Sequence, residues 1–276
     1  MRRGVYGLLV LAGAVMGCGD SDASKSGDGV PRAVPRTQSA AARALPLPVM
    51  RLAQARIGAD PATGRAVQVR VLIEGQIAGD SLINVGALDS TCGVGRTDTL
   101  VTRSGAAVVG AMVWVEGPTA VHAPAGTPER RTTISLEGCQ LRPRVQVAPP
   151  GSMLLLVMRD PRAELLVVVP ASVSVRIDTV SFLTDGQLVP VRQRADSVGV
   201  LAVYATRLPW ARAFIAVTPP AVSAVTDVDG VARFTLDRAG RKAVLRAWHP
   251  ALGIVSATVD PSTLANGAIV TLTFKP

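Results

Sequence analysis

The chain is most constrained by its short apolar runs, which Gly and Pro residues separate along most of its length. The clearest run spans 66–74, where β-branched residues occupy every second position. A period of two with β-branched residues is typical of a strand with one buried face. No amphipathic helix of useful length lies between the runs, so the pattern predicts an all-β protein built as an antiparallel sandwich. The other strands that we expect are 98–101, 107–116, 131–136, 144–147, 153–158, 164–169, 172–180, 199–205 and 213–217.

The length of 276 residues exceeds the roughly 100–150 residues of a typical domain, which favours two domains. At the amino terminus, Arg2 and Arg3 precede an apolar stretch at 4–16, as in a secretory signal. The end of this stretch resembles a bacterial lipobox, in which a Cys is acylated and becomes the new amino terminus. The resemblance implies a lipoprotein signal peptide at 1–17 and lipidation of Cys18. An ordinary signal peptide with an incidental Cys is the alternative.

Residues 18–65 begin with a polar stretch that has no apolar periodicity, so we expect a flexible tether there. Gly19 rather than Asp follows Cys18. The lipobox resemblance therefore implies a lipoprotein of the cell envelope, sorted to the outer membrane and facing the periplasm or the cell surface.

The chain has three Cys residues, and lipidation of Cys18 leaves Cys92 and Cys139 as an even pair in an oxidising compartment. We predict a disulfide between them. Two buried free thiols are the alternative, because a sequence does not show the Cα separation that a disulfide requires.

The net charge is +9, and removal of Arg2 and Arg3 with the signal leaves about +7. A basic balance attracts nucleic acid or anionic lipid. The Arg residues are scattered, however, and aromatic residues that stack on bases make up only 3% of the chain. Together with the export signal, this composition argues against a nucleic-acid partner.

The stretch LAVYATRLPWARAF at 201–214 resembles the ligand loop of bacterial blue-copper (cupredoxin-like) proteins. In that family Cys-x-x-His-Pro-Trp-Met is followed by Arg-Ala-aromatic. The segments TCG at 91–93, AVVGAMVWVEG at 107–117 and GCQLRPRVQVAPPG at 138–151 are similar to the family's first half. The resemblance implies a degenerate cupredoxin-like Greek-key sandwich over 66–217. The residues that keep the frame of the loop are Pro209, Trp210, Arg212, Ala213 and Phe214.

The positions that match the family's copper ligands hold Glu164, Ala205, Leu208 and Ala211. Blue copper needs thiolate and imidazole with a weak axial ligand, and neither Ala nor Leu donates an electron pair. We therefore expect no metal and no cofactor at this loop. His122 and His249 are the chain's two His residues, and we expect structural or surface roles for both.

Residues 224–253 resemble a carboxypeptidase regulatory-like module, a small transthyretin-like β-sandwich, which we expect over 218–276. Asp229 and Gly230 predict a tight hairpin there, because Gly tolerates the positive φ of the primed turns. With Asp227 they superficially resemble a calcium loop. That loop needs further oxygen ligands and a terminal bidentate Glu, which the sequence does not place, so we prefer the hairpin.

Trp210 has two interpretations. It packs beneath the loop, whose interior an apolar plug of Ala205, Leu208 and Ala211 fills, or it is exposed between Arg207 and Arg212 and recognises a sugar or peptide. We favour the plug.

The leading hypothesis is a lipid-anchored, non-enzymatic envelope protein that serves as a binding or structural module, with an unknown protein or glycan partner. One alternative is a periplasmic hydrolase that uses Glu164, Asp160 and Asp227. Another is carbohydrate binding by the carboxy-terminal sandwich, which rests on fold analogy.

Overall fold

The structure is a computed structural model that is all-β, with strands β1 to β22. None of the residues it describes belongs to a helix long and apolar enough to cross a membrane. The expected signal peptide, Cys18 and the tether as far as residue 47 lie outside the described residues. Those described are 48–56, 63–75, 81–83, 92, 96–98, 101–122, 131–161, 163–170, 178–191, 198–208, 210–219 and 221–275.

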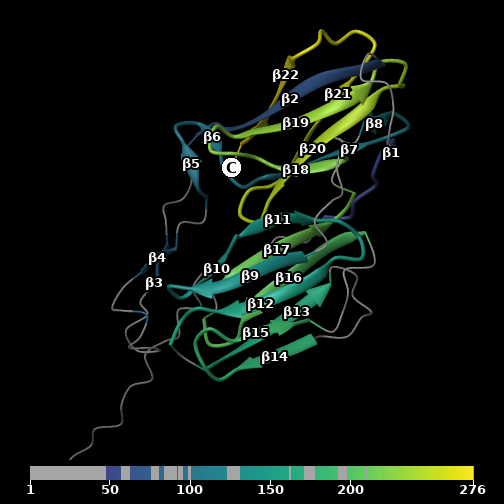
Figure 1. Cartoon of the computed structure of the whole chain (residues 1–276). Coiled ribbons are helices and arrows are strands. Elements are labelled where there is room, and N and C mark those ends of the chain that lie inside the picture. Colours follow the sequence, from purple (N-terminus) through teal and green to yellow (C-terminus); the bar gives the residue numbers. More distant parts are fainter. Residues whose placement is uncertain are drawn as a thin grey trace, which may run out of the picture. The chain divides into compact units, whose positions relative to one another are not determined.

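The first unit, here called the split sandwich, combines strands from both ends of the described chain (Figure 1). Its larger sheet has the order β1 (Gln54–Arg56), β8 (Ala120–His122), β19 (Val231–Asp237), β2 (Gly64–Ile73), β6 (Ala107–Val108) and β5 (Arg103–Ser104), and β22 (Ala268–Phe274) also pairs with β2. Its smaller sheet has the order β18 (Ser223–Val225), β7 (Met112–Glu116), β20 (Ala243–His249) and β21 (Gly253–Val259). The alternating Val residues of β2 pack in the core between these sheets, as their period of two predicts.

The second unit, here called the central sandwich, is formed by the described residues between 131 and 217. One sheet has the order β10 (Gln140–Arg142), β9 (Arg131–Glu137), β12 (Met153–Met158) and β15 (Leu188–Pro190). The other has the order β11 (Val145–Ala148), β17 (Arg212–Val217), β16 (Gly199–Ala205), β13 (Glu164–Pro170) and β14 (Asp178–Phe182). Apolar side chains from both sheets form one buried cluster. A separate pair consists of β3 (Ser81–Ile83) and β4 (Arg96–Asp98).

The sheets divide the chain differently from the expected domains at 66–217 and 218–276. Strand β2 lies between β19 and β22, and β7 lies between β18 and β20, so the carboxy-terminal strands share both sheets with earlier ones. Alternation along a strand shows which face is buried, but it carries no information about which strand is the neighbour. The tether also ends earlier than residue 65, because 54–56 form β1 and the amide of Ala53 donates to the carbonyl of Val115.

The expectation of a purely antiparallel sandwich is wrong, because some strand pairs are parallel. Four pairs are parallel, namely β1 with β8, β2 with β22, β9 with β12, and β11 with β17. A parallel pair needs a crossover connection, which depends on the route of the chain and not on the pattern within a strand.

A third buried cluster joins side chains from the smaller sheet of the split sandwich to side chains from β11, β16 and β17. Trp248 and Phe214 meet edge to face in this cluster, with ring centroids 5.2 Å apart. Edge-to-face contacts of this kind add to the stability that burial of the rings provides.

Candidate functional site

The loop that resembles a copper-binding loop connects β16 to β17 in the central sandwich. It is closed by two backbone hydrogen bonds, from the amide of Ala205 to the carbonyl of Ala211 at 3.1 Å and from the amide of Ala211 to the carbonyl of Leu208 at 2.8 Å. The exposed fractions of Ala205, Leu208 and Ala211 are 4%, 0% and 1%. Apolar side chains therefore pack at three of the positions where the family would carry ligands.

Glu164, the fourth position, is the first residue of β13 and is buried. Its Oε1 atom accepts hydrogen bonds of 3.1 Å from the amides of Leu165 and Arg207 and from the hydroxyl of Thr206. The carboxylate therefore fastens the start of the loop to β13, where Leu166 is the register partner of Ala205. The structure thus brings the four predicted positions to one end of the central sandwich.

Trp210 is buried beside this loop, and its indole Nε1 donates a 2.9 Å hydrogen bond to the carbonyl of Cys139. This position favours the packing interpretation and is incompatible with an exposed Trp210. Arg207 is exposed, whereas Arg212 is half-buried with its guanidinium carbon 5.8 Å from the centre of the Tyr204 ring. Burial raises the pKa of Tyr204, and the charge of Arg212 opposes that shift.

The predicted disulfide between Cys92 and Cys139 is confirmed, with a Cα separation of 5.8 Å. Cys139 and Gly138 form the two-residue connection between β9 and β10, and their φ values are 60° and 56°. Two central residues with positive φ define the primed type I turn of β-hairpins. A side chain in this region costs about 1–2 kcal/mol, so surrounding contacts must hold Cys139 in place.

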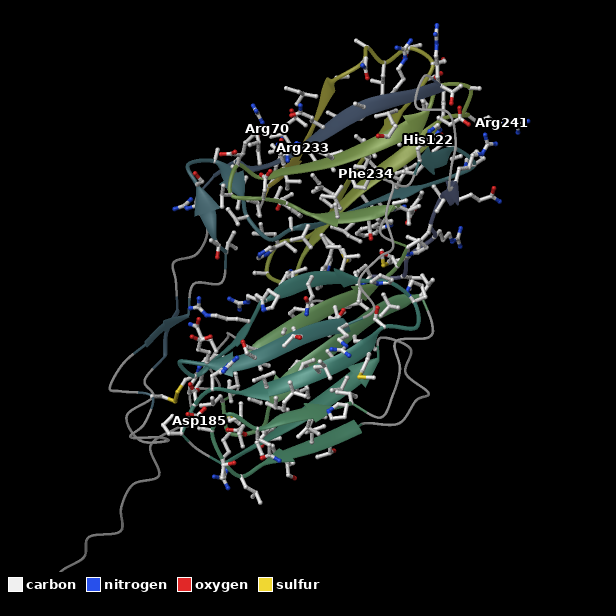
Figure 2. The ribbon with its side chains drawn as sticks, viewed as in Figure 1. Arg70, His122, Asp185, Arg233, Phe234 and Arg241 are labelled. Atoms are coloured by element: carbon white, nitrogen blue, oxygen red, sulfur yellow. A yellow bond between two sulfur atoms is a disulfide. The ribbon has the colours of Figure 1, made fainter. Side chains whose placement is uncertain are left out.

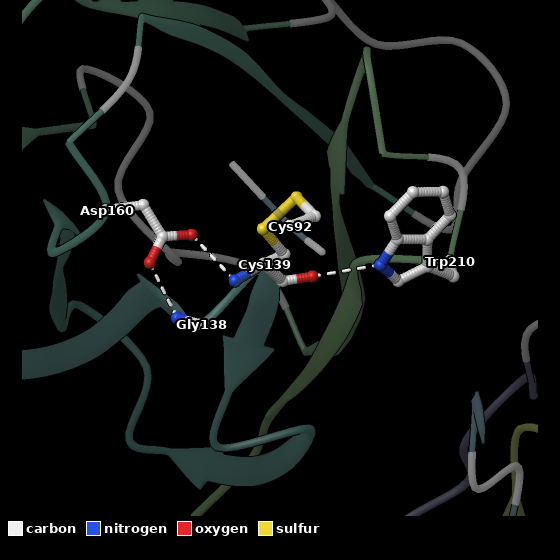
Figure 3. The surroundings of a disulfide bond; sticks show 5 residues. All are labelled: Cys92, Gly138, Cys139, Asp160 and Trp210. Atoms are coloured by element: carbon white, nitrogen blue, oxygen red, sulfur yellow. Dashed lines mark hydrogen bonds between the residues drawn. A yellow bond between two sulfur atoms is a disulfide. The ribbon is translucent and has the colours of Figure 1, made fainter. Parts of the chain in front are cut away.

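Asp160 supplies such contacts, as Figure 3 shows. Its two carboxylate oxygens accept hydrogen bonds of 2.6 Å from the amides of Gly138 and Cys139. The sequence had suggested Asp160 as a hydrolase carboxylate, and its role as a turn anchor was missed. No local pattern could have revealed it, because the bonded residues are 21 and 22 positions away.

Asp227, in the split sandwich, also holds a turn. Its Oδ1 accepts hydrogen bonds of 3.0 Å from the amides of Asp229 and Val231, and Gly230 has the expected positive φ of 69°. The turn is not a hairpin, however, because β18 and β19 belong to different sheets and it forms a corner between them. A 2.7 Å hydrogen bond from Arg233 is the largest cause that lowers the pKa of Asp227.

The three carboxylates of the hydrolase alternative therefore anchor turns and loops, and Asp227 lies in a different sandwich from the other two. In the part of the chain that is described, no cluster of three or more His, Cys, Asp or Glu is placed to hold a metal ion.

The two His residues lie in the split sandwich, away from the loop. His249 ends β20, and its Nδ1 accepts a hydrogen bond of 3.2 Å from the amide of Ala251. Burial, with a smaller effect from the charge of Arg144, lowers the pKa of His249 to about 3. His122 ends β8 and is also buried. Both His residues are thus buried, which fits the expected structural role and not the surface role.

No family model matches the chain, and no curated protein matches it. Among solved structures, parts of the chain are similar to copper proteins. These include the Cu-containing nitrite reductase of Thermus scotoductus (18% identity, 36% of this chain, 24% of that chain, TM-score 0.27). They also include a purple cupredoxin of Nitrosopumilus maritimus (13% identity, 32% of this chain, 99% of that chain, TM-score 0.27). Amicyanin of Paracoccus versutus is a third (14% identity, 36% of this chain, 91% of that chain, TM-score 0.28).

The chain thus spans only about a quarter of the nitrite reductase, 24% of its length. These likenesses cover a third of this chain at low identity and low TM-score. They assign neither a family nor an activity to it.

Proposed function

We propose that this chain is a lipid-anchored, non-enzymatic envelope protein in which a cupredoxin-like sandwich without copper ligands serves as a rigid binding or structural module. One observation carries the proposal. At the loop where the family binds copper, Ala205, Leu208 and Ala211 are buried and Glu164 is occupied by hydrogen bonds to the same loop. Ala and Leu side chains donate no electron pair to a metal, and the Glu164 carboxylate already accepts hydrogen bonds from this loop.

The cysteine chemistry supports the same proposal. The chain has three Cys residues, and Cys92 and Cys139 are bonded to each other. Cys18 is the remaining thiol, and it is the proposed acylation site. A mature protein of this kind has no free thiolate, which a blue-copper site requires.

We propose a protein rather than a glycan as the partner, because the Trp and Phe rings offer no exposed stacking face. All three Trp and all four Phe residues of the chain are buried, with exposed fractions of 8% or less. Recognition of a sugar by stacking needs an exposed aromatic face. The carbohydrate-binding alternative therefore gains no support from these rings.

Copper titration of the purified mature protein tests the loss of the metal site. We expect no stoichiometric binding and no intense visible absorption from a thiolate-to-copper transition. One tightly held copper per chain with that absorption would overturn the proposal. Reduction of the disulfide before titration is the control, because it shows whether a thiolate from Cys92 or Cys139 creates an adventitious site.

Palmitate labelling in a bacterial host tests the anchor. Wild-type chain should incorporate the label and fractionate with membranes, and Cys18→Ser should do neither. Label in Cys18→Ser, or its absence from wild type, would refute acylation at Cys18. Cell crosslinking of the wild-type chain then tests the binding role, for which the expected product is a protein adduct.

A further inference from the structure

One end of the split sandwich carries a concentration of positive charge. It is formed by the end of β1, the start of β2 and the turn 238–242 between β19 and β20. Its parts are joined by a hydrogen bond from the amide of Arg238 to the carbonyl of Thr63 at 3.0 Å and by pairing of Arg65 with Leu236. We call it the basic end, and its cations are Arg56, Arg65, Arg238, Arg241 and Lys242.

Asp237 organises this end. Its Oδ1 accepts a 3.0 Å hydrogen bond from the amide of Ala239, and its Oδ2 accepts a 2.8 Å bond from the guanidinium of Arg56. Its backbone carbonyl accepts the amide of Gly240 at 3.0 Å, which closes the turn. The side chain of Asp237 is only 10% exposed. The turn is thus a defined structure whose carboxylate lies inside and whose cations lie outside.

The three cations of the turn are exposed, and four of the five cations at the basic end form no ion pair with another described residue. Arg238, Arg241 and Lys242 are exposed, and Figure 2 shows Arg241 at the outside of the ribbon at this end. Within the described part of the chain, none of these three forms an ion pair, and neither does Arg65. Elsewhere in the same sandwich, Arg233 and Arg246 pair with Asp227 and Glu116.

Asp260 is a second acidic group that interacts with a cation of the turn. Its carboxylate is hydrogen-bonded to the hydroxyl and amide of Ser262, and the positive charge of Lys242 acts on it. Among the described residues of the basic end, the five cations interact with two carboxylates, Asp237 through Arg56 and Asp260 through Lys242. The basic end therefore keeps a net positive charge, which attracts an anionic surface.

We propose that the basic end binds the anionic headgroups of a phospholipid bilayer. The inference rests on the proposed acyl anchor at Cys18, which would hold the sandwich near a membrane. An acyl group on the same chain would present headgroups to the domain at a high effective concentration. Weak attraction by several cations is then enough for frequent contact. A soluble polyanion such as nucleic acid lacks this tethering, so lipid is the partner that the charge and the anchor together favour.

The test uses the processed chain with Cys18→Ser, so that acylation has no part in the result. Its binding is measured by co-sedimentation with vesicles of phosphatidylcholine alone and of phosphatidylcholine mixed with phosphatidylglycerol. We expect binding only to the mixed vesicles, and weaker binding at high salt. Arg241→Gln with Lys242→Gln should lower that binding by about tenfold or more at low salt.

The matched control is Arg70→Gln with Arg103→Gln, which removes the same charge from exposed positions of the split sandwich outside the basic end. This control should bind mixed vesicles nearly as well as the parent chain. Equal losses in both double variants would overturn the proposal, because binding would then follow net charge alone. Binding to a DNA duplex without binding to mixed vesicles would overturn it in favour of a soluble polyanion. Palmitate labelling reports separately on the anchor, so failure of either idea is recognised by itself.

Discussion

The indole nitrogen of Trp210 donates its hydrogen to the carbonyl of Cys139 across 2.9 Å, and this bond links the copper-like loop to the disulfide (Figure 3). Cys139 is thereby held by its amide, its carbonyl and its sulfur, through Asp160, Trp210 and Cys92. Three attachments at one residue explain how a non-glycine residue keeps a φ of 60°.

The Trp210 bond predicts a specific loss of stability. Trp210→Phe removes the donor and leaves the Cys139 carbonyl unpaired, which should cost about 1–3 kcal/mol beyond the change in ring size. The control is Trp248→Phe, because the Nε1 of Trp248 is buried and has no hydrogen-bond partner in the described structure. Urea unfolding of both variants should show the larger loss for Trp210→Phe. Trp248→Phe also changes the edge-to-face contact with Phe214, so a larger loss for Trp210→Phe is a stringent result, and a smaller loss for Trp210→Phe would contradict this account.

The corner turn between β18 and β19 predicts a second contrast. A Cβ at Gly230 would lie 2.8 Å from the Cβ of Ala107 and 2.9 Å from the carbonyl oxygen of Val71. Gly186 has a similar φ of +75° but no atom within 4 Å of such a Cβ. Both Ala variants should lose about 1–2 kcal/mol from the positive φ, and Gly230→Ala should lose about 1–3 kcal/mol more from the collision. Thermal unfolding that ranks Gly186→Ala as the less stable would contradict this account.

Burial on one face imposes a period of two, and this period predicted several individual strands, whereas the expected strand at 107–116 is two strands, β6 and β7, in different sheets. The strands at 153–158 and 199–205 have the expected bounds, and 66–74 differs from Gly64–Ile73 by no more than two residues at either end. Two of the partners of β2, namely β19 and β22, begin more than 150 positions later in the chain, and nothing in the period of β2 identifies them. Sheet membership was therefore the part that failed.

The site shows the same division between local and distant information. Cysteine arithmetic predicted the pair Cys92 and Cys139, and the loop frame predicted that Trp210 packs below its own loop. The role of Asp160 depends on a contact between two separate strand ends, so its sequence neighbours gave no sign of it. A carboxylate far from its partners in sequence looks the same whether it catalyses a reaction or anchors a turn.

His249 predicts how stability depends on pH. Its pKa is lowered from 6.5 to about 3 in the folded protein, first by burial and then by the charge of Arg144. Below pH 6.5 the imidazole of His249 therefore binds a proton in the unfolded chain but not in the folded one. The free energy of unfolding consequently falls as the pH drops from 6.5 towards 3. The slope is at most about 1.4 kcal/mol per pH unit.

His249→Asn keeps an acceptor for the amide of Ala251 but does not titrate. Chemical unfolding at neutral and mildly acid pH should show a steeper loss for wild type than for this variant. His122 remains in both proteins and so does not affect the difference. Identical slopes would mean that His249 is protonated as readily when folded as when unfolded.

Restoring the ligands tests whether the loop keeps the frame of a copper site. Two backbone hydrogen bonds connect the buried residues Ala205, Leu208 and Ala211, and Glu164 is hydrogen-bonded to the same loop. Ala205→Cys, Leu208→His, Ala211→Met and Glu164→His together would supply thiolate, two imidazoles and a weak axial sulfur. The combined variant should bind one copper with intense visible absorption.

The same variant with Ala205 retained should lack that absorption, because it has no thiolate. A second version that keeps Glu164 preserves the hydrogen bonds to Thr206 and Arg207 in case the full set does not fold. A folded full variant that binds copper without the thiolate absorption, or binds none, would show that the frame is not that of a cupredoxin.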